Sequence, residues 1–175
     1  MKNTLEAMKI ALDMEKSGYK IYMDAAQKTL NKLGKSTLEA IAAQELEHIK
    51  VIEGYCQRPD ADPEAAKMIG QIKHSDKRDY IKQIIGKVGQ KLEGKVKADV
   101  ELSDAYKTAM DLERESYAFY KNLSEEAAVP TVKAFFKYMM EQENAHYALF
   151  QETLEYLDHP GDWFKEQERW IVEGG

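Results

Sequence analysis

The sequence is poor in cysteine, with Cys56 as the only one among 175 residues. A single cysteine excludes an intrachain disulfide and any zinc or iron–sulfur site that would need several cysteines of this chain. Because a chain without disulfides suits a reducing environment, we expect a cytoplasmic protein.

Long apolar segments are also lacking. The first nine residues are charged and hold no apolar stretch of signal-peptide length, and no run of 18 apolar residues occurs anywhere. We therefore expect a protein that is neither exported through a signal peptide nor inserted in a membrane. Its net charge of −6 argues against a general nucleic-acid-binding protein.

Helix-breaking residues are few, with four prolines and ten glycines, whereas hydrophobic residues make up 43% and charged residues 32%. This composition favours long amphipathic helices, and the length suits one domain with its own core. Apolar residues at helical spacing predict four long helices. They cover about 4–30, 36–56, 103–127 and 130–157.

The connections between these helices differ in length. Asn31 to Lys35 would close the first helix, and Ser36 with Glu39 would start the second through a capping box. The connection 58–102 is long enough to run back along a bundle, and apolar residues at helical spacing indicate that part of it is helical. We therefore predict an all-α four-helix bundle over 1–175. Its parts are a first hairpin at 1–57, a crossover at 58–102, a second hairpin at 103–158 and a tail at 159–175.

The two predicted hairpins repeat each other at an offset of 98 residues. Residues 11–22 read ALDMEKSGYKIY and residues 109–120 read AMDLERESYAFY, with five of twelve positions identical. The same offset carries QELEH at 44–48 onto QENAH at 142–146. Each hairpin therefore has an equivalent inner surface, which indicates a bundle with approximate twofold symmetry.

The repeat places six side chains that can bind metal in matching positions. Residues three apart on a helix lie about 60° apart around its axis and roughly 4.5 Å along it, so a Glu-x-x-His pair can point inward together. One such motif alone would more often make a local surface contact, but two copies, each 30 residues after a matching glutamate, favour metal binding. The expected ligands are Glu15, Glu45, His48, Glu113, Glu143 and His146.

Four carboxylates and two neutral imidazoles supply a charge that balances two divalent cations. In helical bundles this set forms dinuclear iron or manganese sites. Hard oxygen donors with a minority of imidazole do not suit a tetrahedral structural zinc site. We therefore expect two iron ions, with manganese or a mixed pair as alternatives.

Four further residues would surround these ligands. Tyr22 and Tyr120 lie seven residues after the single glutamates, so each would either hydrogen-bond a ligand carboxylate or be plain core. Gln44 and Gln142 precede the paired glutamates, and each would accept a hydrogen bond from the histidine of the opposite half.

Over all four helices, these motifs resemble the rubrerythrin-like, diiron-carboxylate branch of the ferritin-like superfamily. The resemblance implies a ferritin-like bundle whose diiron centre reacts with oxygen or hydrogen peroxide. It also implies that Glu45 and Glu143 bridge the irons and that the other four residues each bind one iron. The sequence departs from the family in lacking the four-cysteine rubredoxin module, and in having Ser116 where rubrerythrins commonly supply an extra glutamate.

Three functions remain open from the sequence. The first is a diiron oxidoreductase in oxidative-stress defence that reduces peroxide or oxygen, or oxidises ferrous iron. The second is iron storage or handling without peroxidase turnover, and the third is an interaction module with structural metal or none.

The expected partners are a small-molecule oxidant, a separate electron donor such as a rubredoxin-like protein, and a second copy in a homodimer. Between Lys67 and Lys97, nine Lys or Arg stand against three Asp or Glu. This stretch is either a solvated helix face or the docking site of an acidic electron carrier. The docking residues would be Lys73, Lys77, Arg78 and Lys82.

Overall fold

The computed structural model describes residues 2–57 and 100–159, which form four α-helices and no strand. The four predicted helices are confirmed, each with small shifts at its ends. They are α1 (Lys2–Lys28), α2 (Lys32–Gln57), α5 (Val100–Glu126) and α6 (Pro130–Asp158). Most of the predicted crossover, including its basic residues, and the tail from 160 onward lie outside the described residues.

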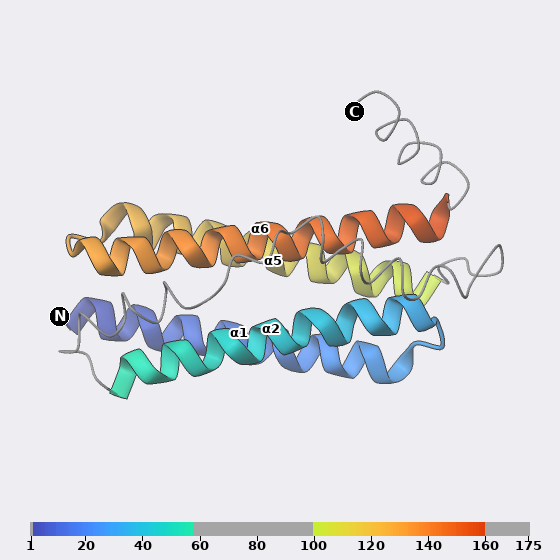
Figure 1. Ribbon diagram of the computed structural model, residues 1–175, viewed down its shortest axis with the longest axis horizontal. Helices are drawn as coiled ribbons and strands as arrows, with labels where there is room; N and C mark the ends of the chain where they lie inside the picture. The colour runs from blue at the N-terminus through green and yellow to red at the C-terminus, as the bar shows by residue number, and fades with distance from the viewer. Residues whose placement is uncertain (1, 58–99, 160–175) are drawn as a thin grey trace, which may run out of the picture.

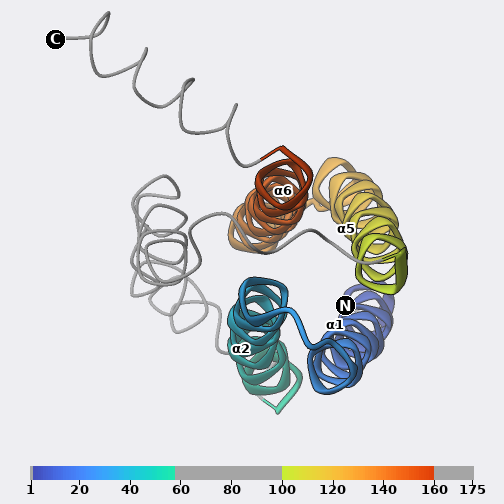
Figure 2. The ribbon, with the colours of Figure 1, turned by 90° about the vertical axis from the view of Figure 1, so that its right-hand side faces the viewer.

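The helices pack as two antiparallel hairpins, α1 with α2 and α5 with α6. Viewed end on, α1 lies beside α5 and α2 beside α6 (Figure 2). α2 ends at one end of the bundle and α5 begins at the opposite end (Figure 1). This placement confirms the predicted topology of two short hairpins joined by one connection that spans the bundle length. It also makes the neighbours α1 and α5 antiparallel.

The start of α2 differs from the prediction. α2 begins at Lys32, and the side chain of Asn31 accepts a hydrogen bond from the Gly34 backbone N–H at 2.9 Å. Asn31 is therefore the N-cap, and the predicted capping box of Ser36 and Glu39 is wrong. Gly34 lies in the first turn of α2. A side chain is disfavoured there because a Cβ would stand 2.6 Å from Leu102 Cδ2. Close packing against α5 explains this glycine better than a break between helices does.

Two apolar clusters form the core, one on each side of the bundle's middle. One contains Tyr22, Leu38, Ile41, Tyr106 and Phe150, and the other contains Met8, Ile52, Tyr120, Phe136 and Met139. The residues between them along the helices include the six predicted ligands. The core therefore excludes water from both sides of that central layer.

Candidate metal centre

All six predicted ligands lie together in the central layer, and each is at most 3% exposed. Their ligating atoms form two groups, within each of which all atoms lie within 4.8 Å of one another. One group is Glu15, Glu45, His48 and Glu143, and the other is Glu45, Glu113, Glu143 and His146. Glu45 and Glu143 belong to both groups, so the cluster offers two adjacent cation positions with two carboxylates in common.

Both histidines turn Nδ1 toward the carboxyl groups. His48 Nδ1 lies 3.0 Å from Glu15 Oε2 and 3.4 Å from Glu45 Oε2. His146 Nδ1 lies 2.9 Å from Glu45 Oε1 and 3.4 Å from Glu113 Oε2. The two imidazole rings stack, with centroids 5.5 Å apart and planes inclined by 24°. Nδ1 is therefore the ring nitrogen available to a cation in each half.

The two tyrosines form crossed hydrogen bonds between the halves. Tyr22 on α1 donates to Glu113 Oε1 on α5 at 2.6 Å, and Tyr120 on α5 donates to Glu15 Oε1 on α1. Because α1 and α5 are antiparallel neighbours, a tyrosine two turns beyond one glutamate comes level with the other glutamate. The predicted tyrosine–carboxyl bonds are thus confirmed. Burial, and then the nearby carboxylates, raise the pKa of both phenols, so both remain donors.

The glutamines do not repeat this symmetry. Gln44 Oε1 lies 3.4 Å from His146 Nε2, in agreement with the prediction. The matching bond from His48 to Gln142 is absent, because His48 Nε2 has no hydrogen-bond partner among the described residues. The two surroundings also differ in packing: the Tyr138 ring lies edge-on to His48, 6.5 Å between centroids, whereas the matching residue of the first half is Ala40.

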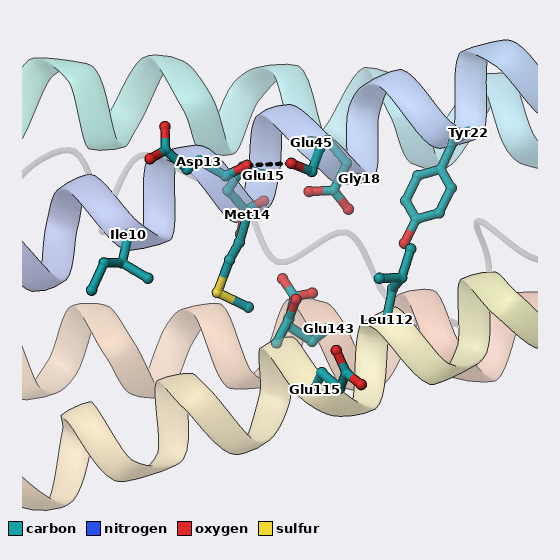
Figure 3. Close-up of a pocket in the computed structure, with 12 residues that line it drawn as sticks. Ile10, Asp13, Met14, Glu15, Gly18, Tyr22, Glu45, Leu112, Glu115 and Glu143 are labelled. Atoms are coloured by element: carbon teal, nitrogen blue, oxygen red, sulfur yellow. Dashed lines mark hydrogen bonds between the residues drawn. The ribbon is translucent and has the colours of Figure 1, made fainter.

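Protons neutralise part of the cluster's charge. Burial, followed by repulsion from Glu45, raises the pKa of Glu15 to about 8, and a hydrogen bond joins these two carboxyl groups (Figure 3). Burial and the neighbouring carboxylates also raise the pKa of Glu143. Burial likewise raises the pKa of Glu45, but attraction to His146 and hydrogen bonds outweigh it, so its pKa lies well below the usual value.

The histidines hold protons in the same way. Burial lowers the pKa of each imidazole, but the adjacent carboxylates outweigh burial and raise the pKa to about 9 for His48 and about 10 for His146. Groups with raised pKa values stabilise the fold below their unfolded pKa and lose that contribution as the pH rises through the folded pKa. The apoprotein therefore loses stability between about pH 4.5 and about pH 10.

The donor set fits hard divalent cations. Four carboxyl groups and two imidazoles converge. Glu143 Oε1 has no hydrogen-bond partner within the described ranges, and Glu113 Oε2 and His146 Nδ1 have only ion-pair contacts without hydrogen-bond geometry. Buried polar atoms without partners are costly, and cations bound here would satisfy them. The cations would take the place of the protons on the carboxyl and imidazole groups.

A cavity beside this cluster was not predicted. It has a volume of about 270 Å³ and lies between α1 and α5 (Figure 3). Met14 and Glu115 both line it. Its signal in the sequence is the pair Gly18 and Ser116, small residues at matching positions three residues after the single glutamates.

Fold and cluster together define a four-helix bundle with a buried carboxylate–imidazole site that can hold metal. The family model described as Rubrerythrin matches residues 6–154, and the chain therefore belongs to the rubrerythrin family. This family typically binds iron. No curated protein and no solved structure matches the chain significantly. Within 2–57 and 100–159, no helix has the length and apolar character needed to cross a membrane.

Proposed function

We propose that the chain binds two iron ions with these six residues and works as a cytoplasmic diiron oxidoreductase. It would reduce hydrogen peroxide or oxygen, or oxidise ferrous iron, in oxidative-stress defence. The observation that carries the proposal is the sharing of Glu45 and Glu143 by two buried four-residue groups. Two cations held a short distance apart need ligands in common, and a carboxylate has two oxygens with which to bridge them.

In this proposal each remaining ligand serves one iron. Glu15 and His48 would hold one ion, and Glu113 and His146 would hold the other, with both imidazoles binding through Nδ1. Bound iron would supply the ferrous/ferric redox couple that passes electrons to the oxidant.

The surrounding residues orient the ligands and exclude water from the layers before and after them along the bundle. Tyr22 and Tyr120 hold the carboxylates of Glu113 and Glu15 by donating to one oxygen of each, which leaves the other oxygen for metal. The apolar clusters on both sides lower the local dielectric and thereby strengthen each ligand–cation interaction. Electrons would come from a separate donor, because this sequence has one cysteine and therefore no rubredoxin module.

The test is a reaction of the ferrous protein with peroxide. Protein loaded anaerobically with two ferrous ions per chain is mixed with hydrogen peroxide, and near-ultraviolet absorbance is followed by stopped flow. We expect oxidation much faster than that of free ferrous iron, and repeated peroxide consumption when an excess of reductant is present. A rate equal to that of free iron would contradict the proposal. Retention of many irons per chain by a large assembly, without repeated turnover, would favour iron storage instead.

A matched pair of variants separates the site from general effects of mutation. Glu143→Gln removes one shared carboxylate, whereas Glu47→Gln makes the same change at an exposed residue of α2 that forms an ion pair with Lys50 at 2.7 Å. We expect Glu143→Gln to abolish the fast reaction and Glu47→Gln to leave it unchanged. Equal rates in both variants would show that the reacting site lies elsewhere.

A further inference from the structure

The cavity between α1 and α5 connects exposed residues with the buried cluster. Its lining includes exposed residues such as Asp13, Ser17 and Glu115, and the buried residues Glu15 and Glu143. Figure 3 shows Asp13, Glu15, Glu115 and Glu143 around the space between the two helices, with Glu143 pointing across it toward α1. At about 30 Å³ per water, a volume of about 270 Å³ has room for roughly nine waters. By volume, the space is large enough for a divalent cation with its six waters.

Two small residues keep the cavity open. Gly18 and Ser116 occupy matching positions of the repeat, one on each helix, and both line the cavity. A Cβ at Gly18 would meet the Tyr22 ring at 3.5 Å, an ordinary contact, so packing alone does not require glycine there. Larger side chains at either position would extend into the space that leads to the carboxyl groups.

Unpaired carboxyl groups occur at both the outer and the inner part of the cavity. Asp13 and Glu115 are exposed and form no ion pair with another described residue, whereas their basic neighbours are paired, Lys16 with Glu53 at 2.9 Å and Arg114 with Asp111 at 2.5 Å. Inside, Glu143 is 2% exposed, and its Oε1 has no hydrogen-bond partner within the described part of the chain. A cation that enters from the surface would therefore meet the exposed negative charges first, and then a buried oxygen that lacks a hydrogen-bond partner within the described residues.

We propose that this cavity is the passage by which hydrated divalent cations reach the metal centre. Asp13 and Glu115 attract the cation at the surface, Gly18 and Ser116 leave it room, and Glu143 is the buried carboxyl group that receives it. The inference rests on the proposed function only in requiring that the cluster binds metal. It concerns the route and rate of binding and is independent of any later reaction.

The test measures the uptake of Co²⁺ alone by the apoprotein, with stopped-flow absorbance for the rate and a titration for the affinity. Ser116→Leu places a branched four-carbon side chain in the passage, and Ala118→Leu makes a matched change at an exposed α5 residue that does not line the cavity. We expect Ser116→Leu to slow uptake at least about tenfold while the affinity changes less than about threefold. Ala118→Leu should match the wild type in both.

A second variant tests the attraction without blocking the passage. Asp13→Asn combined with Glu115→Gln removes two exposed charges, and we expect uptake about 3–10-fold slower at low ionic strength. Because salt screens exposed charges over about 10 Å at 0.1 M, the difference should shrink as salt rises. If both the double variant and Ser116→Leu take up Co²⁺ at the wild-type rate, the proposed passage is refuted. The metal centre itself is unaffected by that result. Failure of the wild type to bind Co²⁺ would overturn the metal centre itself.

Discussion

Replacing Tyr22 with phenylalanine removes one of the two crossed hydrogen bonds without changing the shape of the core. The Tyr22 hydroxyl donates to Glu113 Oε1 at 2.6 Å, and both residues are at most 2% exposed. The substitution leaves a buried carboxyl oxygen without this donor. We expect the variant to bind metal more weakly and the apoprotein to be less stable.

The size of the effect follows from the burial and charge of the acceptor. Leaving a buried polar group without its partner costs about 1–3 kcal/mol, and more when the group is charged. Residues that orient metal ligands typically contribute about 10–100-fold to metal affinity. We therefore expect Tyr22→Phe to lower the affinity for Co²⁺ or ferrous iron by about 10–100-fold, which corresponds to about 1.4–2.7 kcal/mol.

Tyr106→Phe is the matched control for this experiment. The Tyr106 hydroxyl is also buried and donates to the backbone oxygen of Gly34 at 3.1 Å, an uncharged acceptor outside the metal centre. Its loss should lower the free energy of unfolding by about 1 kcal/mol and leave metal affinity unchanged. Metal titration and urea unfolding of both variants check this. Equal metal affinity in Tyr22→Phe and the wild type would refute the assigned role of Tyr22.

Three further predictions concern proton binding, helix capping and the asymmetry of the halves. Because the pKa values of Glu15, His48 and His146 are raised, the free energy of unfolding of the apoprotein should fall from pH 5 to pH 9, by about 4 kcal/mol from Glu15 alone at about 1.4 kcal/mol per pH unit, as urea denaturation can measure. A flat or rising profile would contradict it. Asn31→Ala should cost about 1 kcal/mol of stability, whereas Ser36→Ala should cost less than about 0.5 kcal/mol, by the same assay. Gln44→Ala should weaken Co²⁺ binding about tenfold and Gln142→Ala less than about threefold, because only Gln44 contacts a ligand histidine; similar losses in both would refute the asymmetry.

Features set by periodicity and repetition could be predicted from the sequence. The four helices follow from the spacing of apolar residues, and the two hairpins follow from the 98-residue offset. The same offset brought together Glu15, Glu45, His48 and their three counterparts, because helical geometry fixes the direction of side chains three residues apart. The crossed tyrosine bonds also follow, once α1 and α5 are antiparallel neighbours.

Features that depend on contacts between helices could not be predicted. Gly34 resembled a helix break in the sequence, but it lies in the first turn of α2, where the close approach of Leu102 from α5 disfavours a larger residue. His48 Nε2 has no hydrogen-bond partner among the described residues and lies on a ring that packs against Tyr138, a contact that the repeat alone does not indicate. The cavity depends on small residues of two helices meeting side by side, which neither helix shows by itself.

The proposed metal centre consists of six buried side chains that bind two metal ions with Glu45 and Glu143 in common. Its most direct test is an anaerobic titration with ferrous iron followed by elemental analysis, on the wild type and on variants with glutamine at either shared position. We expect two irons per chain for the wild type and a loss of tight binding at both positions in each variant, because each carboxylate serves both. Two tightly bound irons in Glu45→Gln and in Glu143→Gln would contradict it.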